Sequence, residues 1–270
     1  MSLKTILFPT DFSDYSRTAM HFAMDLATRA GAQVVLLNSY ELPYSDTVMT
    51  TSLIDIMRKN SEEQLELLQK QLNEQYPDVD VNTRSSLNNT IRAIKNNAKK
   101  YEADLIVMGT KGASGLQEVL IGSNTTAVLN SSDVPVLAIP EKSTVKAIKK
   151  IVYAADFQKD DDKERLRTLC DIAQLIKAEI MILHFQRRDQ VGGVNRDIIE
   201  DVLCDIPHSY HIEPEQNIEQ GIHDFVAAKN ADMVVMMKRK YGFIERLFHE
   251  SQTSKFAYHT TVPFLALHEA

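Results

Sequence analysis

The chain repeats itself with a long period, and this repeat restricts the folds open to its 270 residues. Three apolar blocks recur near the start and the end of each copy: ILFPTDF (residues 6–12) and IVYAADF (151–157), ADLIVM (103–108) and ADMVVM (231–236), and VPVLAI (134–139) and VPFLAL (262–267). Of the 19 aligned positions, 11 are identical. Duplication of one unit accounts for this agreement, and it predicts two domains, 1–143 and 148–270.

Each copy reads as five short strands that alternate with helices. In the first copy the strands are expected at residues 5–8, 33–39, 79–84, 105–108 and 136–139, and the helices at 14–30, 90–101 and from 61 and 124 onward. Ser13 is expected to cap the first helix, Gly31 to end it, and Ser61 to open the second with a Ser-x-x-Gln capping box. Residues 41–60 account for the greater length of the first copy and predict a loop or lid.

Unbroken apolar strands that alternate with helices are typical of a parallel sheet with helices on both faces. Pro135 and Pro263 stand at the start of the last strand of each copy. Because proline is tolerated chiefly on edge strands, the fifth strand is expected to lie outside.

Composition narrows the class of protein. The chain is 44% hydrophobic and carries a formal net charge of −7, which argues against a nucleic-acid or anionic-membrane partner. No apolar run approaches the ~20 residues of a membrane-spanning helix, so a cytoplasmic protein is expected. Cys170 and Cys204 are too few for a disulfide framework and predict reduced, buried thiols.

A glycine-rich segment follows the strand at 105–108. It begins with Gly109, Gly112 and Gly115, and Gly122-Ser123 opens the next helix, with Ser123 as its expected cap. Glycines let backbone N–H groups approach an anion closely, and the helix adds its positive dipole end, so the segment predicts a phosphate site. The alternative is that these glycines only make turns. Neither a P-loop nor a dinucleotide fingerprint is present.

The run GTKGASGLQEVLIGS, residues 109–123, reads Gly-x2-Gly-x9-Gly-Ser and resembles the ATP-binding signature of the universal stress protein family. ILFPTDFS, VVLLNSYE and VPVLAIP also resemble blocks of that family. The resemblance implies two tandem Rossmann-like (adenine nucleotide α-hydrolase-like) α/β domains, each a five-stranded parallel sheet in the order 3-2-1-4-5. Family members pair through their last strands, so a tandem chain looks like an intramolecular pseudo-dimer; a further homodimer of chains stays open.

The same resemblance implies the roles of individual residues. Pro9 and Asp11 would border the adenosine, the backbone near Ser39 would face adenine, and Met108 and Gly109 would line the ribose and phosphate path. The phosphates of ATP, with or without Mg²⁺, would be held by backbone N–H and hydroxyl groups, with a lysine as counter-charge: Lys111, Gly112, Gly122, Ser123, Asn124 and Thr125. Asp11 can equally cap the adjacent helix.

The second copy departs from this pattern. In the aligned repeats Met237 replaces Gly109, Lys240 replaces Gly112 and Glu250 replaces Gly122. Side chains at these places would block close approach of the backbone to phosphates, so at most one ATP per chain is expected. Seven of the eight histidines lie in this half, without a pattern of Cys or carboxylate residues that would complete a metal site.

These features predict a nucleotide-dependent regulator of the stress response with an unidentified protein partner. No general base stands beside the phosphates, so any hydrolysis of ATP should be slow. Two alternatives remain open at this point. One is a metal-dependent ATPase or nucleotidyl transferase that uses Asp11, and the other is an interaction module without a nucleotide.

Overall fold

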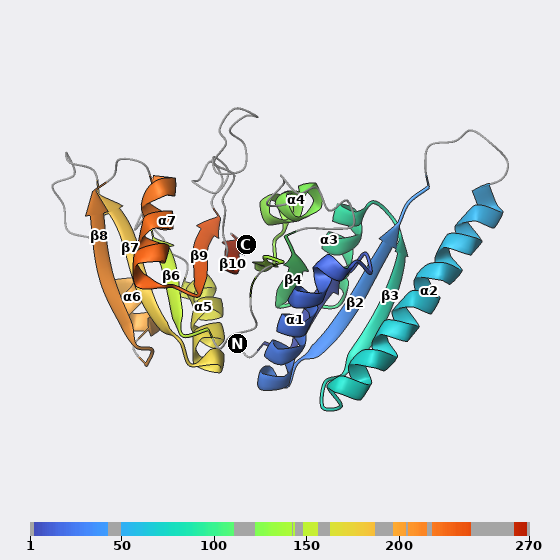
Figure 1. Ribbon diagram of the computed structural model, residues 1–270, viewed down its shortest axis with the longest axis horizontal. Coiled ribbons are helices and arrows are strands. Elements are labelled where there is room, and N and C mark those ends of the chain that lie inside the picture. The colour runs from blue at the N-terminus through green and yellow to red at the C-terminus, as the bar shows by residue number, and fades with distance from the viewer. Residues whose placement is uncertain are drawn as a thin grey trace. The chain divides into compact units, whose positions relative to one another are not determined.

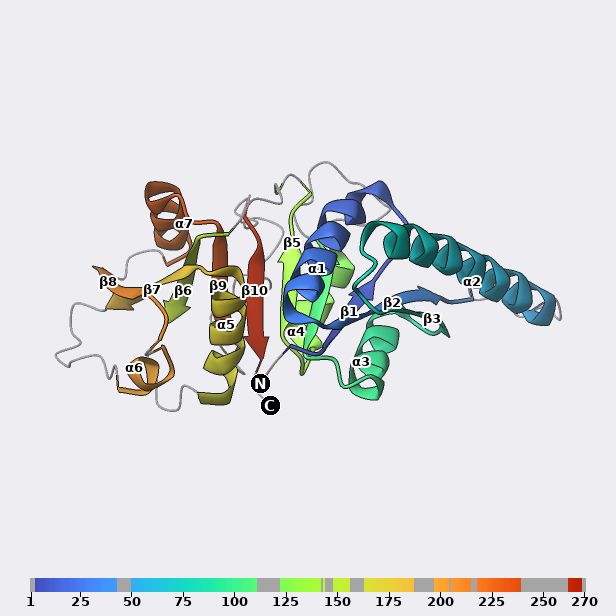
Figure 2. The ribbon, with the colours of Figure 1, turned by 90° about the horizontal axis from the view of Figure 1, so that it is seen from below.

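The computed structural model describes residues 3–42, 50–110, 122–141, 143, 148–155, 163–186, 197–203, 205–214, 218–238 and 262–268. The chain packs into two compact units, Leu3–Glu141 and the residues from Lys142 onward. Each unit contains one parallel β-sheet with helices on both faces (Figures 1 and 2). Among the described residues no helix is long and apolar enough to cross a membrane.

The N-terminal unit follows the predicted alternation of strands and helices. Its elements are β1 (Thr5–Pro9), the 3₁₀ helix η1 (Asp14–Ser16), α1 (Arg17–Ala30), β2 (Gln33–Tyr40), α2 (Thr50–Gln75), β3 (Val81–Leu87), α3 (Thr90–Lys100), β4 (Leu105–Gly109), α4 (Ser123–Ser131) and β5 (Val136–Ile139). The strands are hydrogen-bonded in the order β3-β2-β1-β4-β5, and each neighbouring pair is parallel. This order confirms the expected 3-2-1-4-5 arrangement.

The C-terminal unit repeats the same order. Its described elements are β6 (Lys150–Ala155), α5 (Lys163–Ile176), β7 (Glu179–Gln186), α6 (Asp197–Leu203), β8 (His208–Pro214), α7 (Ile218–Lys229), β9 (Met233–Lys238) and β10 (Phe264–His268). The order β8-β7-β6-β9-β10 places its third, second, first, fourth and fifth strands exactly as in the other unit's sheet. The fold class predicted from the sequence is therefore confirmed for both copies.

The strands are parallel, but the order in which the chain adds them to the sheet reverses at the boundary between β1 and β4. From β1 the chain moves outward through β2 to β3, with α1 and α2 on one face of the sheet, and then returns through α3 on the opposite face to β4 (Figure 2). Right-handed crossovers impose this change of face. Ile6, Leu7 and Phe8 of β1 are completely buried, because helices cover the central strands on both sides. A ligand crevice is expected where the order reverses, at the carboxyl ends of β1 and β4.

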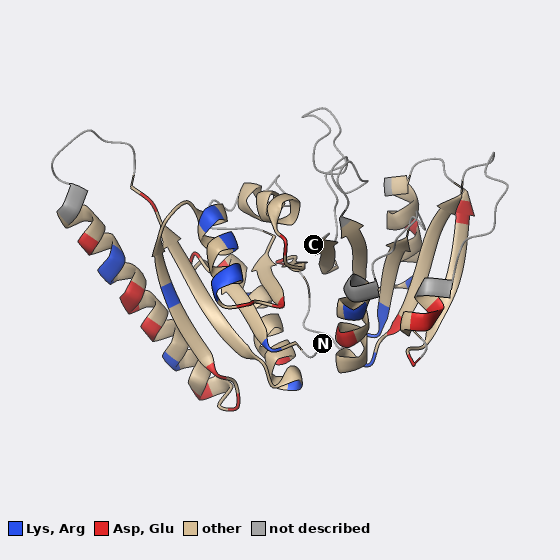
Figure 3. Ribbon diagram, turned by 180° about the vertical axis from the view of Figure 1, so that it is seen from behind, with Lys and Arg blue, Asp and Glu red and all other residues tan. Residues whose placement is uncertain are grey.

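The helix α2 corrects two expectations. Residues 50–60, predicted to belong to a loop or lid, are helical, while residues 43–49 lie outside the described residues. Ser61 does not cap a helix: it lies in the middle of α2 and is only 4% exposed. The Ser-x-x-Gln pattern resembles the start of a helix because the preceding turns of α2 carry exposed apolar side chains, Leu53 and Ile56, which obscure the helical periodicity. Charges of both signs follow the rest of α2 (Figure 3).

One carboxylate in each unit joins the first strand to the fourth. Oδ2 of Asp104 accepts hydrogen bonds from the backbone N–H groups of Lys4 and Thr5, at 2.8 and 2.9 Å. Oδ2 of Asp232 accepts the corresponding bonds from Lys149 and Lys150, at 2.9 and 3.0 Å. The repeated Ala-Asp pair of the sequence thus has a structural meaning: its carboxylate holds the amino ends of the two central strands together.

The register of the strands makes the two copies comparable residue by residue. Gly109 pairs with Ile139 in the first unit, and Met237 pairs with Leu267 in the second. Both pairs are separated by 128 positions from their counterparts, as in the sequence alignment. Met237 therefore occupies the place of Gly109, whereas Lys240 and Glu250 lie outside the described residues. Cys170 is a buried thiol, as expected, and its Sγ lies 3.5 Å from the carbonyl oxygen of Val202, whereas Cys204 lies outside the described part.

Candidate functional site

A cavity of about 350 Å³ opens at the carboxyl ends of β1, β2 and β4 in the N-terminal unit. Its walls come from the ends of these strands, from η1 and from the first turns of α3 and α4. Figure 1 shows α4 and the start of α3 at this end of the sheet. The cavity thus lies at the reversal of strand order, and its volume falls within the range of small-molecule sites.

Nine of the eleven residues proposed from the sequence line this cavity: Pro9, Asp11, Ser39, Met108, Gly109, Gly122, Ser123, Asn124 and Thr125. Lys111 and Gly112 lie outside the described residues. The structure adds six lining residues that the sequence reading did not single out: Thr10, Ser16, Leu37, Asn38, Thr90 and Ile94. Of these, Thr10 and Asn38 were accessible to prediction, since each adjoins the carboxyl end of a predicted strand.

Within the described part of the chain, the N-terminus of α4 carries no side-chain cap. Its N-cap residue is Gly122 rather than the expected Ser123, and Gly122 has no side chain with which to accept a hydrogen bond. The N–H of Gly122 donates to the carbonyl of Thr110, and the N–H of Thr126 donates to Gly122. The N–H groups of the intervening residues have no helical acceptor because a helix leaves its first donors unsatisfied. They lie on residues that line the cavity, where an anion would satisfy them.

The hydroxyl of Thr125 has a different use from the one expected. Its Oγ1 donates a 2.8 Å hydrogen bond to the carbonyl oxygen of Gly109, and the side chain is buried. An anion such as phosphate accepts hydrogen bonds, and the hydroxyl proton of Thr125 is already donated to Gly109. Only the backbone N–H of Thr125 could therefore donate to such an anion.

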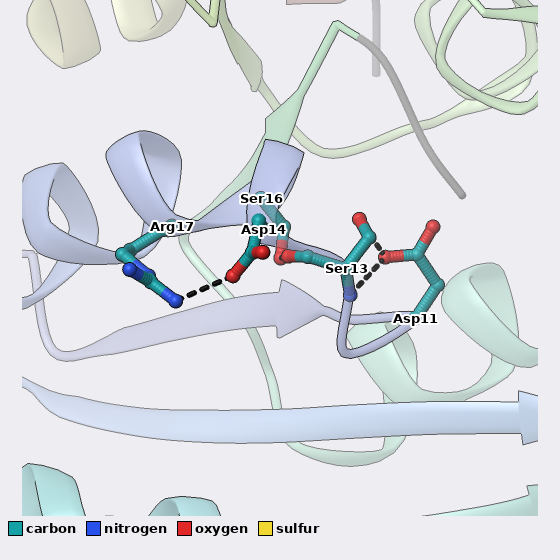
Figure 4. Close-up of polar contacts among 5 residues, drawn as sticks. All are labelled: Asp11, Ser13, Asp14, Ser16 and Arg17. Carbon is teal, nitrogen blue, oxygen red and sulfur yellow. Dashed lines mark hydrogen bonds and ion pairs between the residues drawn. The ribbon is translucent and has the colours of Figure 1, made fainter. Parts of the chain in front are cut away.

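Asp11 organises the turn that follows β1. Its Oδ1 accepts hydrogen bonds from the N–H of Ser13 at 3.1 Å and from the hydroxyl of Ser13 at 2.6 Å (Figure 4). This corrects the prediction for Ser13, whose hydroxyl bonds Asp11 and makes no cap bond; α1 begins only at Arg17, after η1. An aspartate that bonds the backbone two residues ahead forms an Asx turn. Gly31 ends α1 in the left-handed conformation, with φ of 65°, as predicted.

The wall formed by β2 presents Leu37 and two polar side chains, Asn38 and Ser39, each of which is hydrogen-bonded to other elements. Nδ2 of Asn38 donates to the carbonyl of Thr10 at 2.8 Å, and Oδ1 of Asn38 accepts from the hydroxyl of Ser61 on α2 at 2.7 Å. Ser61 in turn accepts a 2.8 Å bond from Ser85 on β3. The chain of bonds explains why Ser61 is tolerated in the middle of a helix, and it links the cavity to α2.

Ser39 and Thr90 form the second polar contact of this wall. The hydroxyl of Ser39 donates to Oγ1 of Thr90 at 3.0 Å. Thr90 is the first residue of α3, whose N-cap Asn89 accepts a side-chain hydrogen bond from the N–H of Ile91. The N-terminus of α3 is therefore capped by the protein itself, in contrast to that of α4.

Among the described lining residues, Asp11 alone carries a charge, and the N-terminus of α4 contributes other residues to the same lining. The positive end of the helix dipole favours an anion at α4, whereas the carboxylate favours hydroxyl donors or a cation beside it. No group of three or more His, Cys, Asp and Glu side chains gathers as metal ligands would in the described part of the chain. The cavity is thus suited to an elongated ligand with one anionic end.

Comparisons with known proteins agree with this architecture. A sequence model of the universal stress protein family matches residues 2–140 and 205–268. One universal stress protein of Methanocaldococcus jannaschii is 30% identical over 140 residues, which cover 50% of this chain and 81% of the relative. A second from the same organism is 27% identical over 157 residues, with 52% and 97% covered. Each of these relatives therefore matches about half of this chain.

A full-length match exists among solved structures. The crystal structure of a universal stress protein from Archaeoglobus fulgidus covers 100% of both chains with a TM-score of 0.78 and 21% identity. At that identity the agreement shows a common fold. Two doubly wound α/β units with a crevice at the strand reversal define the class of protein, and the family match spans well over half of the sequence. The chain belongs to the universal stress protein family.

Proposed function

We propose that the protein is a nucleotide-dependent regulator that binds one ATP per chain in the cavity of its N-terminal unit. The observation that carries the proposal is the uncapped N-terminus of α4 in the wall of a 350 Å³ cavity at the reversal of strand order. Unsatisfied N–H groups and the helix dipole favour phosphate there. Because ATP is an intracellular ligand, we place the protein in the cytoplasm.

The geometry of the cavity orders the parts of the ligand. Phosphates would lie at Gly122, Ser123 and Asn124, where backbone donors are available. The ribose hydroxyls would face the carboxylate of Asp11, which accepts hydrogen bonds but repels phosphate. The base would then lie along the β2 wall beside Ser39 and Thr90. Any Mg²⁺ bound with the phosphates would supply charge neutralisation.

Hydrolysis is expected to be slow. Among the described lining residues no histidine or lysine is present, and the one carboxylate, Asp11, holds the turn at Ser13 through its Oδ1. A general base must reach a water molecule beside the terminal phosphate. Asp11 already accepts two hydrogen bonds from Ser13, which supports binding rather than turnover.

The output of binding would pass to α2. Asn38 lines the cavity, and its side chain bonds Ser61 in the middle of that helix. Leu53 and Ile56, toward the start of α2, are 41% and 65% exposed. Occupancy of the cavity would change the environment of Asn38, and so the position of a helix that displays apolar side chains to a protein partner.

The test is the content and affinity of the purified protein. We expect small molecules released by denaturation to include ATP, and calorimetry of the emptied protein to show one site per chain for ATP. Affinity for AMP and cyclic AMP, which lack the phosphate chain, should be lower. The proposal fails if the protein carries no nucleotide and calorimetry detects no binding of ATP with or without Mg²⁺.

A further inference from the structure

The C-terminal unit preserves the geometry of the β2 wall but changes its side chains. In the first unit Pro9 pairs with Leu37, and in the second Ala154 pairs with Leu183, so the next residues, Asn38 and His184, are equivalent. Nδ1 of His184 donates to the carbonyl of Ala155 at 3.0 Å, as Asn38 donates to the carbonyl of Thr10. The two walls therefore share this side-chain hydrogen bond as well as the strand register.

The next residue of each wall differs sharply in size. It is Ser39 in the first unit and Phe185 in the second. The opposing helices are aligned by their ends: Thr90 and Ile218 begin α3 and α7, and Glu102 and Asn230, both with positive φ, follow them at the same separation of 128 positions. The hydroxyl pair of Ser39 and Thr90 is therefore replaced by Phe185 and Ile218, which cannot make that hydrogen bond.

The larger residue on the strand of the second unit is accompanied by a smaller residue on the facing helix. Gly221 of α7 is the counterpart of Ala93 of α3 by the same alignment. A Cβ atom on Gly221 would lie 2.5 Å from Cε1 and 2.9 Å from Cζ of Phe185. The ring thus lies directly against the backbone of α7. The larger strand residue, Phe185 in place of Ser39, therefore comes together with a smaller helix residue, Gly221 in place of Ala93.

We propose that the Phe185 ring is a built-in occupant of the C-terminal unit, which fills the position that a nucleobase takes in the N-terminal unit. This inference rests on the proposed function for the location of the base. An aromatic ring resembles a nucleobase in thickness and apolar faces, and Gly221 provides the flat surface against which it lies. The C-terminal unit then excludes nucleotides through a filled base position, independently of its lost glycines.

The packing of Phe185 on Gly221 predicts that Gly221→Ala changes the melting temperature in opposite directions with and without the Phe185 ring. Alanine in place of glycine in a helix interior ordinarily raises stability, here by about 2–4 °C in melting temperature. Gly221→Ala should instead lower the melting temperature of the wild-type chain, because its Cβ collides with the ring. In the Phe185→Ala background the same change should raise it. Equal shifts in both backgrounds would overturn the proposed packing.

The base position is tested by adding free adenine. In a Gly122→Glu background, which removes the phosphate site of the N-terminal unit, Phe185→Ala should leave a space that adenine fills. We expect millimolar adenine to raise the melting temperature of this variant by a few degrees and to leave the matched Phe185→Leu variant unchanged. No shift with Phe185→Ala, or an equal shift with Phe185→Leu, would overturn the occupant role.

The two proposals fail separately. If the wild-type chain binds no ATP, the proposed function is wrong, whereas the sign reversal at Gly221 and the response to adenine do not depend on ATP. If ATP binds to the wild-type chain but adenine does not raise the melting temperature of the Phe185→Ala variant, the proposed function stands and the occupant role is wrong.

Discussion

The hydroxyl of Thr125 donates a hydrogen bond to the carbonyl oxygen of Gly109, so the first turn of α4 is tied to the last residue of β4. The bond fixes the position of the N-terminus of α4 relative to the end of β4. The same side chain is buried, and water is therefore poorly placed to replace the bond if it is lost. The position of the proposed phosphate donors depends on this contact.

Thr125→Val should weaken both the fold and the site. The shape of the side chain is kept, but the Gly109 carbonyl loses its donor, at a cost of about 1–2 kcal/mol in the free energy of unfolding. Chemical denaturation measures this cost, and calorimetry should show weaker binding of ATP. Thr125→Ser keeps the hydroxyl and should retain most of the affinity; equal losses in both variants would contradict a role for the bond.

Gly122→Glu should abolish ATP binding without unfolding the chain. Gly122 has φ of −63°, which any residue adopts, and a Cβ there would lie 3.4 Å from the Thr110 carbonyl, an ordinary contact. The carboxylate repels phosphate and displaces charge-assisted bonds, so affinity should fall by about 100-fold or more. Gly122→Ala is the control and should melt like the wild type while binding ATP within about tenfold. An unchanged affinity in Gly122→Glu would show that the phosphates lie elsewhere.

Asp11 should matter for the turn more than for chemistry. Asp11→Asn keeps an oxygen that accepts the two bonds from Ser13, and Asp11→Ala removes it. We expect Asp11→Asn to bind ATP nearly as the wild type and Asp11→Ala to bind it several-fold more weakly, by calorimetry. Steady-state assays with Mg-ATP should show little turnover in all three proteins. Turnover that disappears in Asp11→Asn while ATP still binds would favour the metal-dependent ATPase.

Ser61→Ala should reveal the link between the cavity and α2. Loss of the hydroxyl leaves Oδ1 of Asn38 without its donor, which should cost about 1–2 kcal/mol in unfolding free energy. Ser52→Ala, at an exposed position of the same helix, should change stability by less than about 0.5 kcal/mol. Hydrogen exchange of α2 should respond to ATP in the wild type and less in Ser61→Ala. An identical response in both would contradict transmission through Asn38.

Acidification should destabilise the C-terminal unit through His211. Burial beside Phe225 and the nearby charge of Lys229 lower the pKa of His211 from 6.5, against a smaller opposite effect of Glu213. The unfolded chain then binds a proton at a pH where the folded chain does not, so this contribution to stability is complete above pH 6.5 and is lost as the pH falls toward the folded pKa.

His211→Asn should therefore reduce the loss of unfolding free energy between about pH 7.5 and about pH 5.5. His223→Asn is the control, since His223 is 59% exposed and lies 3.7 Å from Asp224. A pH profile of His211→Asn that follows the wild type would show that His211 contributes nothing to the dependence. Denaturation at several pH values gives both profiles.

The fold could be predicted because its signals are local. Unbroken apolar strands, Gly31 at a helix end and the internal repeat all report on the backbone near them, and the strand order followed from the family resemblance. The position of the cavity was also accessible, since its glycines adjoin the end of β4. The sequence could not show that Ser61 lies within α2, because a capping pattern and a buried side-chain hydrogen bond use the same residue types.

The choice of hydrogen-bond partner by individual side chains accounts for the remaining differences. Thr125 bonds a carbonyl 16 residues away, and Ser13 bonds Asp11 rather than the helix, choices that only the folded backbone decides. Phe185 and Gly221 appeared in the sequence as an ordinary strand aromatic and a helix glycine. The contact between them, and its equivalence to the Ser39 position, depend on the folded backbone and the strand register of both units.

The carboxylates of Asp104 and Asp232 hold the amino ends of the central strands, at the opposite end of each sheet from the carboxyl ends where the cavity lies. The hydrogen bonds of these carboxylates therefore do not involve the residues that line the cavity. The second unit carries Phe185 in the place of Ser39 and Met237 in the place of Gly109, and its strands keep the same order. A sheet whose strands are aligned at one end can therefore accept different residues at the other, so that two units of one fold can diverge where a ligand would bind.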